Sequence, residues 1–127
     1  MKLIWISAAL ALLLPAQASA ATWVYVTDSS QRTRYLVDIE TIDRAGSLVT
    51  YWIKLDHSAD SSVKHRETKL RRRADCANDT DILMNMIQYD ADGSVIDSFT
   101  VPSYRQTPSA IVPDSVGESV HSFVCKK

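Results

Sequence analysis

The sequence predicts a small α+β domain in which β-strands occupy most of the chain and one α-helix closes it. Segments between residues 23 and 99 are rich in β-branched and aromatic residues, and several alternate apolar with polar positions, as half-buried strands do. After Pro113 the apolar residues recur instead at the spacing of a helix. An even pair of cysteines in a small exported domain usually forms a disulfide, so we expect one between Cys76 and Cys125.

The chain begins with a segment typical of a secretory signal peptide. Lys2 precedes an apolar run, and Ala18 and Ala20 occupy the small-residue positions of a cleavage site. The run is shorter than the roughly 20 apolar residues that cross a bilayer. We therefore expect residues 1–20 to be removed and residues 21–127 to form one exported domain. It would carry no transmembrane segment and, because no cysteine lies near the cut, no lipid anchor.

Three strands are expected in the first half of this domain. Residues 22–28 are β-rich, and residues 35–39 alternate apolar and polar side chains after a polar turn. Residues 40–46 are expected to form a short turn that ends in glycine. Residues 47–56 give the clearest alternation, with one apolar face made of Val49, Tyr51, Ile53 and Leu55.

A strongly basic segment, residues 64–76, comes next in the chain. Read as a strand, it has charged side chains on both faces, so neither face suits a core. Charged strands suit sheet edges, where they discourage edge-to-edge pairing. We therefore expect residues 64–73 to form an exposed edge strand. The same cations are candidates for contact with polyanions or with acidic patches on a partner: Lys64, Arg66, Lys69, Arg71, Arg72 and Arg73.

The next segment is ambiguous by itself and is resolved by its neighbours. Residues 82–90 fit a helical pattern or, less cleanly, a strand, but the turn at residues 91–93 and the alternation of residues 95–99 favour a β-hairpin. Residues 101–113 contain three prolines and are expected to cross the domain without regular structure.

The last element is expected to be a short amphipathic helix. Ser115 is a candidate N-cap, and Glu118, three residues later, completes a capping box. One apolar stripe is predicted for the helix, made of Val116, Val120, Phe123 and Val124. Cys125 at its end is expected to be joined by the disulfide to Cys76, at the end of the basic strand.

Charge and motifs argue against several classes of function. Removal of Lys2 leaves 13 of the 14 basic residues against 15 acidic ones, a net charge of −2, so no global basic field favours nucleic acid. His57, His65 and His121 form no metal-ligand pattern and are expected at the surface. No nucleophile elbow, phosphate loop or metalloprotease helix occurs. We expect a protein that is not an enzyme, with no catalytic residues, metal or cofactor.

A series of short motifs resembles the bacterial surface-adhesin protein E family. They are a tryptophan-led first strand, "YLVDIETIDRAGSLVTYWIK", an Asp-Cys pair, "QYDADGSVI", "VPDSVGES" and a closing "FVC". The resemblance covers nearly the whole expected mature chain. It implies an antiparallel sheet of about six strands with a C-terminal helix packed against it. Two positions depart from the family: Ala21 stands where a lipid-anchored form needs a cysteine, and Tyr104 is the nearest aromatic residue to a usual tryptophan.

The resemblance implies an exported adhesin-like binding protein, located in the periplasm or at the cell surface or secreted. Its expected partners are host extracellular-matrix or serum proteins or polyanions, met through the basic strand, and nucleic acid is not expected. The alternative is a periplasmic cell-envelope protein that binds a small ligand or an envelope partner and has no host contact. We expect a monomer or a weak dimer, because six cations on one strand would resist pairing of two chains.

Overall fold

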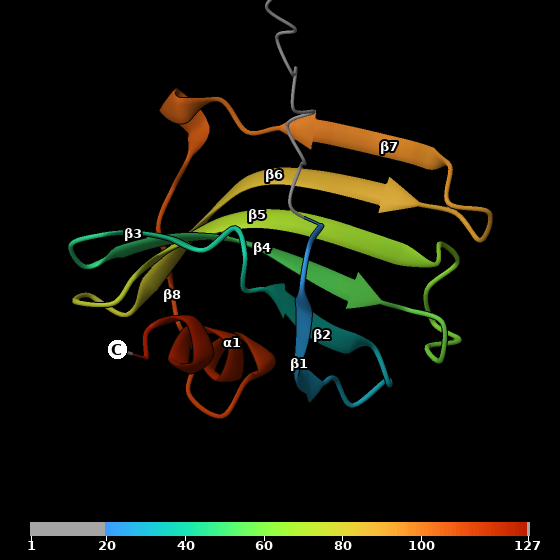
Figure 1. The fold of residues 1–127 in the computed structure, drawn as a ribbon, viewed down its shortest axis with the longest axis horizontal. Helices are drawn as coiled ribbons and strands as arrows, with labels where there is room; N and C mark the ends of the chain where they lie inside the picture. Colours follow the sequence, from blue (N-terminus) through green and yellow to red (C-terminus); the bar gives the residue numbers. More distant parts are fainter. Residues whose placement is uncertain (1–19, 127) are drawn as a thin grey trace, which may run out of the picture.

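Antiparallel strands in one sheet and a single α-helix make up residues 20–126, the part of the chain that the computed structural model describes (Figure 1). The predicted signal peptide falls on residues 1–20 and so lies, apart from Ala20, outside the described residues. In chain order the elements are β1 (Trp23–Asp28), β2 (Arg34–Asp38), β3 (Asp43–Ala45), β4 (Leu48–Asp56), β5 (Glu67–Asp75), β6 (Thr80–Tyr89), β7 (Val95–Thr100), the 3-10 turn η1 (Ser103–Arg105), β8 (Ser109–Ala110) and α1 (Val116–Val124).

The sheet has the strand order β1-β2-β4-β5-β6-β7, with β3 paired to β4 and β8 paired to β6. The expected α+β architecture, with an antiparallel sheet and a C-terminal helix, is confirmed. The short strand β3 lies in a segment that was expected to be a turn, and β8 lies in one that was expected to be irregular. Both are exposed along their whole length, so they carry no apolar alternation by which a sequence pattern could reveal them.

The ambiguous segment is a strand, as its neighbours indicated. β6 and β7 pair as a hairpin, and its turn is closed by a hydrogen bond from the Asp90 amide to the Ser94 carbonyl, 3.0 Å long. Gly93 has a φ of +87°, a conformation that glycine adopts without a steric penalty. The Asp90 carboxylate accepts hydrogen bonds from the amides of Asp92 and Ser94. Local turn chemistry therefore explains where this hairpin reverses.

The prediction that the basic segment is an edge strand is wrong. β5 lies in the middle of the sheet and pairs along its whole length with β4 on one side and with β6 on the other. Lys64 and Arg66 precede the strand and are exposed. A central strand can carry these charges because a sheet has two faces and only one of them is packed against the helix.

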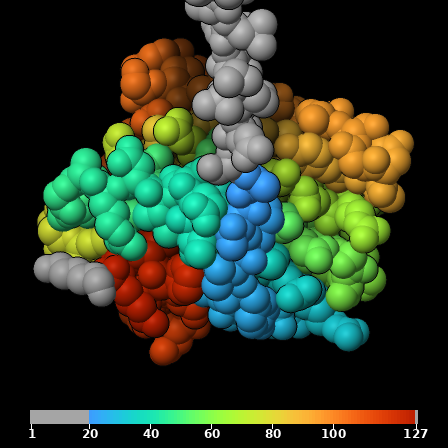
Figure 2. Space-filling view, viewed as in Figure 1, coloured from blue at the N-terminus to red at the C-terminus, as the bar shows by residue number. Residues whose placement is uncertain are grey.

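The core lies between that face and α1. It is formed by Val37, Val49, Tyr51, Ile53 and Ala74 from the sheet, with Val120 and Val124 from the helix. Val120 and Val124 are buried, and Val116 and Phe123 pack partly buried against the same cluster. The predicted apolar stripe is confirmed. In Figure 2 the C-terminal segment lies beside β1 and below the residues of β3.

The start of the helix shows the predicted capping. The Ser115 hydroxyl accepts a hydrogen bond from the Glu118 amide at 3.1 Å. The Glu118 carboxylate in turn accepts from the backbone amide of Asp114 at 2.7 Å, one residue before the N-cap. Two amides at the helix start are thereby satisfied by side chains, which fixes the point where the chain enters α1.

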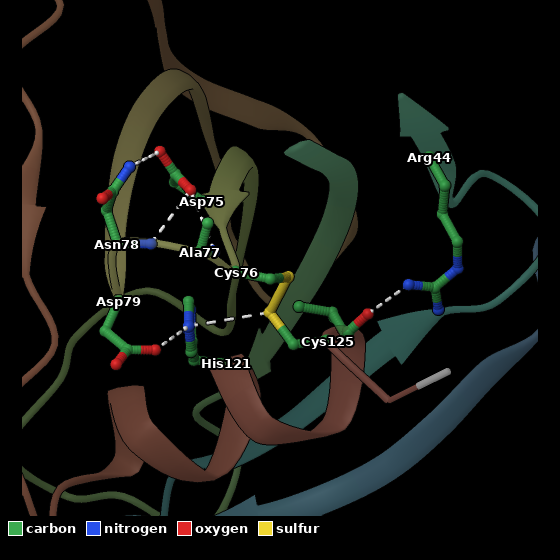
Figure 3. Close-up of a disulfide and its surroundings, with 9 residues drawn as sticks. Arg44, Asp75, Cys76, Ala77, Asn78, Asp79, His121 and Cys125 are labelled. Atoms are coloured by element: carbon green, nitrogen blue, oxygen red, sulfur yellow. Dashed lines mark hydrogen bonds and ion pairs between the residues drawn. A yellow bond between two sulfur atoms is a disulfide. The ribbon is translucent and has the colours of Figure 1, made fainter. Parts of the chain in front are cut away.

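Two contacts hold the end of the helix to the sheet (Figure 3). The disulfide joins Cys76, directly after β5, to Cys125, the C-cap of α1, across a separation of 49 residues. Arg44 of β3 donates a hydrogen bond through Nη1 to the Val124 carbonyl oxygen, 2.6 Å away. A helix of nine residues is too short to persist alone in water. These contacts and the apolar stripe therefore hold it in place.

We predict that the double variant Cys76→Ser, Cys125→Ser is less stable than the wild type by about 4 kcal/mol, the value that the chain-entropy model gives for a closed loop of this length. The melting temperature measured by circular dichroism should fall by more than about 10 °C. Chemical reduction of the wild type serves as the control and should reproduce the loss. Equal melting temperatures for oxidised wild type and variant would contradict this account.

Candidate functional site

The cations of β5 divide between the two faces of the sheet. Successive side chains of a strand point to opposite faces, and the buried residues Thr68 and Ala74 mark the face that packs on the helix. Arg72 lies on that core face. Lys69, Arg71 and Arg73 lie on the other one, which we call the outer face; it carries no α-helix from residues 20–126.

Arg72 is engaged in an ion pair within the fold. Its Nε and Nη2 donate to the two carboxylate oxygens of Asp81 on β6, at 2.8 and 2.9 Å. Burial opposes the charge on Arg72, but hydrogen bonding to Asp81 raises the pKa of the guanidinium above its ordinary value. A two-point contact of this kind is the stronger form of an arginine–carboxylate pair. Arg72 therefore has a structural role in the fold. It does not lie on one strip with the other five basic residues of the segment, as the sequence had suggested.

Aromatic rings accompany the lysines of the outer face. Lys54 Nζ lies 4.8 Å from the centre of the Trp23 ring, and Lys69 Nζ lies 4.8 Å from the Tyr89 ring and 5.8 Å from the Trp23 ring. An ammonium group at such distances is attracted to the negative face of the ring, by about 0.5–1 kcal/mol at exposed sites. The rings thus favour positions of the two lysine side chains close to them.

Charge repulsion is built into the same surface. Lys54 and Lys69 face each other directly across β4 and β5, and like charges in that arrangement are destabilising. Glu67 Oε1 lies 4.0 Å from Lys54 Nζ, and its Oε2 lies 3.7 Å from Lys69 Nζ. One carboxylate therefore bridges two ammonium groups and compensates only part of their charge.

Further outer-face residues extend this arrangement along the strands. Trp52 is the direct cross-strand neighbour of Arg71, and Arg73 lies opposite Thr50. We call the whole group the outer patch: Trp23, Trp52, Lys54, Lys69, Arg71, Arg73 and Tyr89. Sequence reasoning identified three of its cations. It missed Lys54 and the three rings, because β4 and β1 alternate normally and nothing local indicates that their outer side chains meet those of β5.

A buried polar network lies where β4 ends and β5 begins, and sequence reasoning did not find it. The Thr33 hydroxyl donates to the Asp60 carboxylate at 2.6 Å, so its oxygen accepts from Nδ1–H of His57, 2.8 Å away. His57 Nε2 also lies 2.9 Å from the Thr68 hydroxyl oxygen, which in turn lies 2.8 Å from Nε2 of His65. The network thus joins Thr33, before β2, and the loop after β4 to Thr68 of β5.

The expectation of surface histidines is wrong for two of the three. His57 and His121 are buried, with 8% and 6% of their surface exposed, whereas His65 is half-buried. Burial lowers the pKa of His57 below its ordinary value of 6.5, and the neighbouring His65 acts in the same direction. The carboxylates of Asp60, Asp56 and Glu67 oppose this shift.

We predict that stability falls as pH is lowered from 7 toward 5. Below pH 6.5 the unfolded chain binds a proton at His57 that the folded chain does not yet bind, so the free energy of unfolding decreases until the lower folded pKa is reached. Urea unfolding at several pH values should show this slope, and His57→Gln should flatten it while lowering stability at pH 7.5 by about 1–2 kcal/mol. Parallel slopes for both proteins would refute the role of His57.

No group of three or more His, Cys, Asp or Glu side chains within residues 20–126 is placed to hold a metal ion. No helix in this part of the chain is long and apolar enough to cross a membrane.

The outer patch is thus a surface of cations and aromatic rings on a disulfide-linked β-sheet domain. A family model described as Surface-adhesin protein E matches residues 23–126. The match runs from the first residue of β1 to just beyond α1, and the chain belongs to this family. A comparison with curated proteins finds no match. Family membership indicates a binding protein of the surface-adhesin type.

Proposed function

We propose that the chain is exported and acts as an adhesin-like binding protein whose outer patch contacts polyanions or acidic patches on host matrix or serum proteins. The observation that carries the proposal is the pair of facing lysines, Lys54 and Lys69, held over the rings of Trp23 and Tyr89. Their charge is only partly compensated by Glu67. An anionic ligand would remove repulsion that the free protein retains.

The geometry of the strand supports an extended anionic partner. Lys69, Arg71 and Arg73 follow each other at every second position of β5, a spacing of about 6.6 Å along the strand. β5 is hydrogen-bonded on both sides, so the backbone that carries these cations is rigid. The whole chain has a net charge of −1, which makes this positive surface a local feature that would orient an acidic partner.

The first test is retention on heparin, a sulfated polyanion, in a salt gradient. The triple variant Lys69→Gln, Arg71→Gln, Arg73→Gln should elute at distinctly lower salt than the wild type, because electrostatic contacts at a surface are screened by ions. Arg72 is left unchanged, since its loss would leave Asp81 unpaired inside the fold.

The matched control is Arg32→Gln, Arg105→Gln, Lys126→Gln. These three residues are exposed and lie outside the outer patch, and the control changes the net charge by the same amount. It should elute close to the wild type. If both triple variants elute together, net charge rather than the outer patch determines binding, and the proposed contact surface is refuted.

The second test concerns export. The small residues Ala18 and Ala20 predict that mature protein begins at Ala21, and N-terminal sequencing of protein from the producing cell checks this. Protease treatment of intact cells then separates the compartments. Digestion of the domain supports surface display, whereas protection of the mature protein inside the envelope supports the periplasmic alternative. An exported protein that retains Met1 would contradict the cleavage.

A further inference from the structure

A cavity of about 190 Å³ lies between the sheet and the first turn of α1, on the face opposite the outer patch. Its apolar wall includes Ile53, Leu70 and Val120. Two residues of its lining differ in burial: Gly117 is exposed at the surface, whereas Tyr51 is only 2% exposed. The cavity therefore runs from the helix start inward to the sheet. Cavities of roughly 150 Å³ in protein cores are known to accept a benzene molecule, so this one has room for a slightly larger compound.

Polar groups converge at the inner end of this cavity. The Tyr51 hydroxyl makes no hydrogen bond with any residue in the range 20–126, and it is not sealed off as a buried unpaired atom, so it faces the cavity. Burial raises the pKa of Tyr51, and the charges that act on it are those of Arg72 and Asp81. Tyr35 and Arg72 also line the cavity. A hydroxyl that is open to the cavity can exchange its hydrogen bond with solvent for one with a ligand oxygen.

The charge of the site selects the class of ligand. Arg72 and Asp81 neutralise each other through two hydrogen bonds, so no net cation remains to offset the burial of an anion. The Tyr51 hydroxyl can donate to or accept from a neutral oxygen. Apolar walls with a few convergent polar groups are the usual construction of a small-molecule site.

We propose that this cavity is a second binding site, which takes a small neutral molecule with an apolar body and one hydroxyl or carbonyl oxygen bound to Tyr51. The site is independent of the outer patch, because its side chains come from the opposite face of the same strands. It gives the domain a small-ligand function in addition to contact with macromolecules.

The test is a titration of the full mature domain, monitored by ¹H–¹⁵N NMR. Benzyl alcohol is the probe, and toluene and benzoate are the comparison compounds. Benzyl alcohol should cause saturable shifts at the amides of Tyr51, Leu70 and Gly117 and bind more tightly than toluene by up to about tenfold, the worth of one hydrogen bond. Tyr51→Phe should abolish that preference while toluene still binds. Tighter binding of benzoate would overturn the assignment of a neutral ligand.

A cavity-filling variant separates binding at this site from binding elsewhere. Val116→Phe, on the lining, should abolish the shifts without loss of the folded spectrum. Val112→Phe is the matched control, because Val112 is 63% exposed and lies outside the lining, and it should leave the titration unchanged. Absence of saturable shifts in the wild type, or their persistence in a folded Val116→Phe protein, would refute the site. Heparin retention should be the same in both variants.

Discussion

The central position of β5 is the constraint on which the rest of this structure depends. A strand with four cations among nine residues would ordinarily be kept at a sheet edge, yet β5 is paired along its length on both sides. Two of these cations, one on each face, have compensating partners. Arg72, on the core face, is bound by Asp81, while Lys69 lies over aromatic rings and beside Glu67.

The pairing of Arg72 with Asp81 depends on an irregularity in the neighbouring strand. The register between β5 and β6 shifts between Arg71 and Arg72, so that Arg71 faces Asn85 whereas Arg72 faces Leu83. Such a bulge changes which side chains share a face. Asp81 is thereby placed on the core side, next to the guanidinium that needs it. The adjacent residues Arg71 and Arg72 consequently serve different purposes, one at the surface and one at the wall of the cavity.

The helix depends on the same strand for its position. Cys76 follows β5 directly, and its disulfide to Cys125 holds the last turn of α1, while Val120 and Val124 fill the core below. The opposite end of the helix is held by its Ser115 cap and borders the cavity through Val116 and Gly117. The cavity is thus bounded by an element that is anchored at both ends, which favours a preformed site over one that closes on binding.

Local features of this protein were determined by the sequence alone. The alternation in β4, the turn at Asp90 to Gly93, the Ser115 cap and the pairing of two cysteines all follow from residues that are close together or few in number, because each depends on local backbone or redox chemistry. The order of the strands does not follow from such local features. A basic segment has the same pattern at an edge and at the centre, and only long-range pairing with β4 and β6 places it. The burial of His57, the approach of Lys54 to Trp23 and the cavity beside Tyr51 were likewise decided by the tertiary structure, since each joins residues from strands or loops whose contact no local pattern specifies.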